Sequence, residues 1–453
     1  MKKNKDSTSL SGEPLKNPFP SRFCFQRKPI LKLTSKSLSQ QRIKRRIVTY
    51  WEICLTKEMG SQKRVKKVLG QILKLDKSTQ NVFLYYGKNF ESSRQTNQDM
   101  LHLTNSLKGL KCIREIRFSV GNGSYLTDKG LCYLIKGLKR LCRLKNISLM
   151  LDDCQLQVTD NGLDYISRGF KKMRFLENLY LSSYYFEQIT EKGVAKLNGS
   201  LNRLTKLEDL TLKIPYCPGV SDMGFSKINY QKLISLRNLA FYLPSNQQLT
   251  DKCLDFLAQG LRGLPNLQCV ILDFRQCLEL SNKGLFHLWE MMNNLLSLRR
   301  FDLSLLACPE INAVFRDMNR TLRCLDSIRE LHLDFFDCEK ITYEGLVDLC
   351  QALEKFASLE SLSIDFTGCA EITDLGAKEI IVCMKKLKHL ESLSVDLQDI
   401  KITKAILKDI EKLLESQTSL NKVTIELGWH CIEIDSLYDK LKTIKPDLDI
   451  KFY

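Results

Sequence analysis

The stretch LDSIRELHLDFFDCEKITYEGLVDLCQAL, residues 325–353, recurs in varied form along most of this chain. In the next copy, which begins at Phe356, matching residues return about 31 positions later. The matching pairs are Leu331 and Leu362, Leu333 and Ile364, Phe335 and Phe366, Cys338 and Cys369, Ile341 and Ile372, Thr342 and Thr373, and Gly345 and Gly376. A period of this length is typical of a solenoid, in which each unit buries its apolar side only against its neighbours.

Each copy contains two hydrophobic periods, one after the other. Apolar residues first alternate with polar ones, as in Leu331-His332-Leu333-Asp334-Phe335, and this alternation predicts a strand with one buried face. A Thr or Ser that suits a helix N-cap follows, and the apolar spacing then changes to three and four residues. The sequence predicts strands centred on Phe118, Leu149, Leu181, Leu212, Phe241, Leu272, Leu303, Leu333, Ile364, Val395 and Ile425, with a last strand at residues 448–452.

Small residues mark the turn after each strand and the start of each helix. Cys or Asn follows the strand by three positions, where Asn can satisfy backbone groups and Cys can fill space. The residues at this place are Asn89, Cys154, Cys217, Asn246, Cys277, Cys308, Cys338 and Cys369. We expect the glycine of each helix start to let that helix press against its neighbour. We interpret the basic pairs at helix ends, such as Lys139-Arg140 and Lys171-Lys172, as partners of the helix dipole.

The phrase Cys-x-x-Ile-Thr-Asp-x-Gly-Leu resembles leucine-rich repeats of the ribonuclease-inhibitor-like and cysteine-containing subtypes. It is similar to the phrase of F-box leucine-rich-repeat proteins and of expanded repeat families of protists. The resemblance covers about residues 76–453. It implies an α/β horseshoe of about 11–12 repeats, with a parallel sheet on the concave face and helices on the convex face.

Two features depart from that family. The period of about 31 residues is longer than the period common in leucine-rich repeats. The copy at residues 295–324 lacks the Thr and the Gly of the helix start, so we expect a bend or a shift of the array there. Residues 1–75 also lack the Leu-Pro opening of an F-box and are too basic to resemble one.

The positive charge of the chain is concentrated at its N-terminus. Residues 1–75 contain 19 Lys and Arg against 4 Asp and Glu, whereas the other 378 residues contain 50 against 48. We predict a disordered basic arm at 1–36, basic amphipathic helices that cap the solenoid at 37–75, and the leucine-rich-repeat domain at 76–453. The first of these helices would place Ile43, Ile47, Trp51 and Cys54 or Leu55 on one face. The basic residues that we single out are Lys44, Arg45, Arg46, Lys63, Arg64, Lys66 and Lys67.

The bulk composition indicates an intracellular protein. The 17 cysteines fall mostly at repeat positions that we expect to be buried, and they form no close Cys-x-x-Cys pair, so we predict reduced thiols and no zinc site. The chain contains no secretory signal, and no apolar run is long enough for a membrane span. We predict a cytoplasmic location, with the nucleus as the alternative.

Catalytic signatures are missing from the sequence. It contains no phosphate-binding glycine loop, no serine elbow and no zinc motif, and evenly spaced carboxylates on a flat sheet lack the convergence of a catalytic site. We therefore expect a protein that is not an enzyme and that uses no cofactor or metal.

The outward strand residues predict a binding surface on the concave face. Its C-terminal half reads as a row of acids, with aromatic and imidazole side chains elsewhere on the face. The candidate partner-binding residues are Asp273, Asp302, Asp334, Asp365, Asp396, Glu426, Tyr180, Tyr242 and His332. Stacked carboxylates repel one another unless a nearby cation neutralises their charge. Two sources of positive charge would fit this row: a basic protein partner, or the basic arm of this chain.

Three functions remain open on the sequence alone. The first is a scaffold that grips a protein partner on the concave face. The second, which follows from the resemblance, is a substrate adaptor of a ubiquitin ligase, and it requires helices in residues 39–75. The third is a binder of nucleic acid or an anionic surface through residues 1–75 within a larger complex. The sequence does not determine the oligomeric state.

Overall fold

The computed structural model describes residues 50–55, 80–86, 93–107, 110, 112–120, 125–151, 157–184, 186–311, 314–322, 326–403, 405–427 and 449–452. The chain divides into two compact units, Met1–Ile47 and Val48–Tyr453, and every described residue belongs to the second unit. The predicted arm and all seven basic residues singled out above therefore lie outside the described residues.

The described strands form one parallel sheet whose strand order follows chain order from β1 to β14. The strands are β1 (Tyr50–Leu55), β2 (Asn81–Tyr86), β3 (Glu115–Val120), β4 (Asn146–Leu151), β5 (Asn178–Ser183), β6 (Asp209–Lys213), β7 (Asn238–Tyr242), β8 (Cys269–Asp273), β9 (Arg300–Ser304), β10 (Glu330–Asp334), β11 (Ser361–Asp365), β12 (Ser392–Leu397), β13 (Lys422–Leu427) and β14 (Asp449–Phe452). The predicted strand centres from Phe118 to Ile425 lie opposite one another in unbroken register. Those predictions are confirmed.

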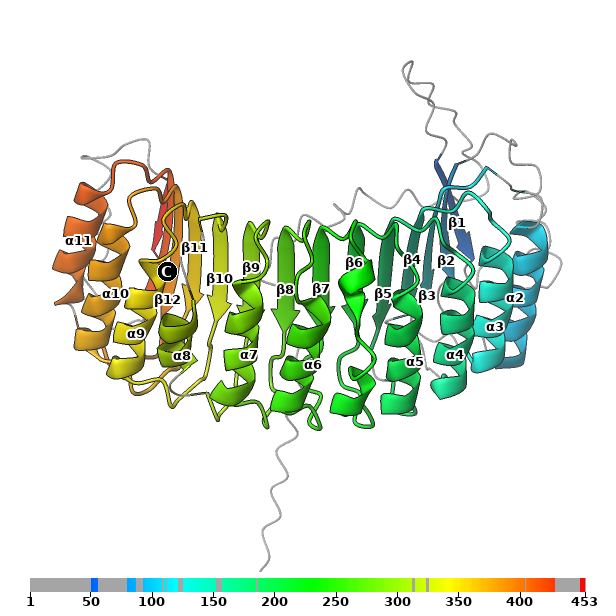
Figure 1. Ribbon diagram of the computed structural model, residues 1–453, viewed down its shortest axis with the longest axis horizontal. Coiled ribbons are helices and arrows are strands. Elements are labelled where there is room, and N and C mark those ends of the chain that lie inside the picture. The colour runs from blue at the N-terminus through cyan, green and yellow to red at the C-terminus, as the bar shows by residue number, and fades with distance from the viewer. Residues whose placement is uncertain are drawn as a thin grey trace, which may run out of the picture. The chain divides into compact units, whose positions relative to one another are not determined.

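Helices alternate with the strands and lie together on one face of the sheet (Figure 1). They are α2 (Ser93–Leu107), α3 (Asp128–Leu138), α4 (Asp160–Phe170), α5 (Glu191–Leu201), α6 (Asp251–Leu261), α7 (Asn282–Met292), α8 (Val314–Thr321), α9 (Tyr343–Leu353), α10 (Asp374–Lys386) and α11 (Ile406–Ser416). The architecture is thus an α/β solenoid built from strand–helix repeats. We call the sheet face that points away from these helices the open face.

One apolar core runs along the solenoid between sheet and helices. Successive strand side chains point to opposite faces, so buried and half-buried residues alternate along β3 and β12. The buried residues join the inner helix faces in a continuous cluster, in which Trp289 packs edge-on against Phe301. Burying one such aliphatic or aromatic side chain stabilises the fold by about 1.5–3 kcal/mol, which makes this core the main stabilising feature.

Residues 50–55 contradict the prediction of a helix. They form strand β1, in which Trp51 lies opposite Val82 and Ile53 opposite Leu84 of β2. Trp51 and Leu55 are four residues apart, which suits one face of a helix, but together with Ile53 they also form a strand alternation, and the hydrogen-bonding edge of β2 decides between the two. The sheet therefore begins about one repeat before residue 76. Residues 37–49 and 56–75 of the predicted cap lie outside the described residues.

The repeat between β6 and β7 also differs from the prediction, because it contains no α-helix. Two short 3₁₀ helices, η2 (Asp222–Gly224) and η3 (Tyr230–Lys232), stand in its place. The fully buried Tyr230 ring fills the space, and its hydroxyl donates a hydrogen bond to Asn198 Oδ1 at 3.0 Å. The irregular copy at 295–324 does form a helix, α8, with 8 residues against 11 in α7. The strand register continues from β9 to β10, so the expected shift of the sheet does not occur.

A carboxylate clamp ties successive helix starts together. Asp160, the first residue of α4, accepts hydrogen bonds from Thr190 N at 2.9 Å, from Thr190 Oγ1 at 2.6 Å and from Gly193 N at 3.1 Å in the next repeat. The same carboxylate–hydroxyl pair occurs at Asp128 with Thr159, Asp222 with Thr250, Asp251 with Ser281 and Asp374 with Thr403. A Cβ atom on Gly193 would come within 2.3 Å of Asp160 Oδ1, so the glycine permits the close approach that the sequence predicts.

The turns after the strands form a second ladder. Asn246 Nδ2 donates to the carbonyls of Ile214 and Leu243 at 2.8 and 2.9 Å, as expected for Asn at this place. Cys277 and Cys308 are fully buried, and each Sγ donates to a carbonyl of the preceding repeat at 3.4 Å. The twelve cysteines whose side chains the structure describes, from Cys112 to Cys383, are free thiols. The predicted space-filling role thus comes with a weak hydrogen bond.

Candidate functional site

All nine predicted binding residues lie on the open face, in two parallel rows. Tyr180, Asp302 and His332 occupy the middle of their strands, and Tyr242, Asp273, Asp334, Asp365, Asp396 and Glu426 lie two residues further along. Four of them are direct neighbours across four consecutive strands: Asp334 of β10 lies opposite Asp365, Asp365 opposite Asp396, and Asp396 opposite Glu426. We call these four residues the acidic cluster.

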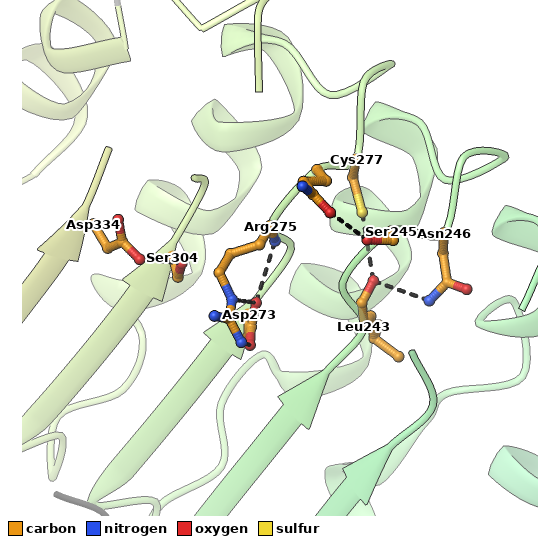
Figure 2. A network of polar contacts seen from close by, with 9 residues as sticks. Leu243, Ser245, Asn246, Asp273, Arg275, Cys277, Ser304 and Asp334 are labelled. Carbon is orange, nitrogen blue, oxygen red and sulfur yellow. Dashed lines mark hydrogen bonds and ion pairs between the residues drawn. The ribbon is translucent and has the colours of Figure 1, made fainter. Parts of the chain in front are cut away.

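Two of the predicted acids, Asp273 and Asp302, are neutralised inside the protein. Asp273 is 1 % exposed, and the Arg275 guanidinium folds back onto its carboxylate, with Nε at 2.9 Å and Nη2 at 2.8 Å (Figure 2). Asp302 is 2 % exposed and binds Arg300 through Nε at 3.0 Å and Nη2 at 2.6 Å. Each carboxylate is therefore buried in a bidentate ion pair with one arginine, and we exclude both from the candidate surface.

In the acidic cluster, each Asp also holds the turn that follows its strand. Asp334 Oδ1 accepts from Phe336 N at 3.2 Å, and the equivalent atoms of Asp365 and Asp396 accept from the backbone two residues on at 2.9 and 3.0 Å. Asp334 is 6 % exposed and also accepts from Ser304 Oγ at 2.6 Å (Figure 2). This Asx-type turn explains why Asp recurs at the strand end. The recurrence of Asp at this strand position is visible in the sequence, and it reflects this turn as well as the surface charge that the sequence predicts.

The carboxyl groups of the cluster share an unfavourable electrostatic environment. Burial raises the pKa of Asp334, Asp365 and Asp396, and the next carboxylate along the row raises each of them further. The pKa of Asp396 rises to about 6, with Glu426 as its neighbour. Within the described part of the chain, no Lys, Arg or His forms an ion pair with any of the four. The cluster therefore concentrates negative charge without a described counter-ion.

His332 adds no positive charge to this region. Burial lowers the pKa of its imidazole to about 4, which exceeds the opposing effect of Asp334, and Arg300 lowers it further. The imidazole is therefore neutral near pH 7. The side chain lies in the middle row, between Asp302 of β9 and Ser363 of β11.

The N-terminal half of the open face has a different chemistry. Lys213 of β6 lies between the two predicted tyrosines, with its Nζ 4.3 Å from the ring centroid of Tyr242 and 5.9 Å from that of Tyr180. Beyond the strands, Tyr184 and Tyr216 are partly exposed and their ring centroids lie 6.3 Å apart. Tyr180 and Tyr242 are among the residues predicted from the sequence. Lys213, whose cation–π contacts join them, is not.

The described residues show neither a metal-binding group nor a membrane-spanning helix. No cluster of three or more His, Cys, Asp or Glu among them has the arrangement to hold a metal ion. Within the same residues, no helix is both long enough and apolar enough to cross a bilayer. The acidic cluster fits this result, because its members lie in a row along the sheet and do not converge on one point.

Comparison with known families and curated proteins finds no match to this chain. The fold and the site thus define a class of molecule, a strand–helix repeat solenoid with an acidic open face.

Proposed function

We propose that this protein is a non-catalytic scaffold of the leucine-rich-repeat type and that its open face binds a protein segment rich in Lys and Arg. The row formed by Asp334, Asp365, Asp396 and Glu426, which no described cation pairs, carries this proposal. A solenoid exposes a long surface relative to its core, and such surfaces are commonly used for binding.

The electrostatics supply the driving force. Neighbouring strands lie about 4.8 Å apart, so consecutive carboxylates of the row repel one another. Cations of a partner placed along the row would relieve that repulsion and would lower the raised pKa values of the three aspartates. Binding therefore releases protons at pH values near the pKa of Asp396, about 6.

The scaffold function fits the observations better than the adaptor function. An F-box-like adaptor would need helices in residues 39–75, and strand β1 occupies residues 50–55 of that segment. Binding of nucleic acid through residues 1–75 stays a prediction, since the basic side chains that it uses lie outside the described residues.

Titration with a fluorescently labelled Lys- and Arg-rich peptide tests the proposal. We expect the double variant Asp365→Asn/Asp396→Asn to bind the peptide about tenfold more weakly, because each half-buried charge contributes about 0.5–1 kcal/mol to such a contact. The matched control Glu371→Gln/Glu415→Gln removes the same charge from exposed positions elsewhere in the described solenoid, and it should bind like the parent.

Acidification provides a second readout in the same titration. We expect the affinity of the parent to fall as the pH drops through about 6, where Asp396 takes up a proton, and the double variant to lose most of this pH dependence. Equal affinities for the parent, the double variant and the control would overturn the proposal.

A further inference from the structure

One edge of the solenoid is strongly basic in its N-terminal half. It consists of the turns that lead from the end of each helix to the next strand, at residues 139–145, 171–177, 202–208, 231–237, 262–268 and 293–299. These six turns contain 13 Lys and Arg against 2 Glu, whereas the later segments between helix and strand, at 322–329, 354–360, 387–391 and 417–421, contain 4 residues of each sign. The excess positive charge of this edge is thus confined to one half of the array.

The six turns lie next to one another, so their charges add. Glu177 N donates to the carbonyl of Lys145, Glu208 N to that of Glu177 and Arg237 N to that of Glu208, at 2.7, 2.7 and 2.8 Å. Asn266 Nδ2 donates to the carbonyl of Ile234 at 2.8 Å, and Ser297 Oγ donates to that of Pro265 at 2.7 Å. Exposed cations along the edge include Arg143, Lys172, Arg174, Arg203, Lys206 and Lys232. None of these six forms an ion pair with a described acid. Arg143, Arg174 and Lys206 lie four or five residues beyond the last residue of their helices, so the helix dipole does not account for them.

The same turns carry protruding apolar side chains. Phe175 is 66 %, Ile234 58 % and Leu296 81 % exposed, and Pro265 is exposed between the last two. Of the four most exposed large apolar side chains in the described chain, three lie on this edge, and the fourth, Leu375, begins helix α10. Side chains of this size are normally found exposed one at a time, so their alignment with the cations marks a contact surface.

The combination discriminates between anionic partners. A polynucleotide offers phosphates to the cations but no apolar environment to Ile234 and Leu296. The surface of an anionic bilayer offers both, since lipid headgroups attract Lys and Arg while short apolar side chains enter the interface. We propose that this edge docks the protein peripherally on an anionic lipid surface. The proposal shares no residue with the acidic cluster and does not depend on it.

Sedimentation of the full-length protein with phosphatidylcholine vesicles, with and without phosphatidylserine, tests the cationic part. We expect binding only to the mixed vesicles and its loss at high salt. The variant Lys172→Glu/Arg174→Glu/Lys206→Glu should bind about 100-fold more weakly, because each Lys or Arg near such a surface contributes about fivefold. The control Lys129→Glu/Lys192→Glu/Lys283→Glu makes the same charge change in the first turns of α3, α5 and α7, and it should retain most of the binding.

The apolar part has its own matched pair. Leu296→Ser should weaken binding to the mixed vesicles about fivefold, whereas Leu375→Ser, an equally large change at an exposed site elsewhere, should not. Both positions are exposed, so both variants are expected to fold, and thermal unfolding by circular dichroism checks this. A single-stranded RNA oligomer serves as the competing anion.

Three results would overturn the proposal. The first is that the protein fails to bind the mixed vesicles at low salt. The second is that both triple variants lose binding equally, which would indicate net charge alone. The third is that RNA binds tightly while Leu296→Ser changes the affinity neither for RNA nor for the mixed vesicles, which would assign the edge to a polynucleotide.

Discussion

At the residue scale, Asp396 shows how one carboxyl group couples the candidate site to pH. Its pKa in the folded protein, about 6, lies above the 3.8 of a free Asp. The proton therefore favours the folded state, so this contribution to stability is complete below pH 4 and is lost as the pH rises through 6.

We expect Asp396→Asn to be more stable than the parent at pH 7.5, by about 1–2 kcal/mol after allowance for solvent screening of a half-buried group. The asparagine can still accept the hydrogen bond of Gln398 N, so the turn should persist. Urea unfolding followed by circular dichroism at several pH values measures the difference, which should shrink towards zero near pH 4. A difference that stays constant with pH would contradict this account, and Glu371→Gln controls for the loss of one charge.

At the element scale, the clamp between helix starts explains how each repeat fixes the next. We expect Asp160→Ala to destabilise the protein by about 2–4 kcal/mol, because three donors from residues Thr190 and Gly193 lose a charged acceptor. Asp164→Ala is the control on the same helix. Among the described residues, Asp164 forms ion pairs with the exposed side chains of Arg168 and Lys196, so its loss should change stability by less than about 1 kcal/mol. Chemical denaturation measures both, and equal effects would argue against the clamp.

At the scale of the whole molecule, the pairing of each described strand with its neighbours in the chain has a dynamic consequence. Each strand from β2 to β13 pairs only with its two neighbours in the chain. Stability in such an array is a sum of repeat and interface contributions, and repeats near an end have less to support them. We expect amide hydrogen exchange, followed by mass spectrometry, to be slowest in β7 and β8 and faster in β3 and β13. Uniform protection along the array would instead indicate a single cooperative unit.

The sequence alone predicted most strands, their inward faces and the helix starts of this protein. This was possible because those features depend on local periods and caps that repeat about every 31 residues. It also predicted that Asp334, Asp365 and Asp396 lie side by side, since equal positions in a solenoid become neighbours.

Only the tertiary structure decided the features in which local patterns allow two outcomes or in which distant residues meet. The spacing of Trp51 and Leu55 fits a helix face and a strand face alike, and pairing with β2 selects the strand. Asp273 and Asp302 look like surface acids until burial and the arginine pairs remove their charge from the open face. The basic edge likewise exists only after stacking, because no single repeat reveals that cations and protruding apolar side chains from six separate turns share one edge.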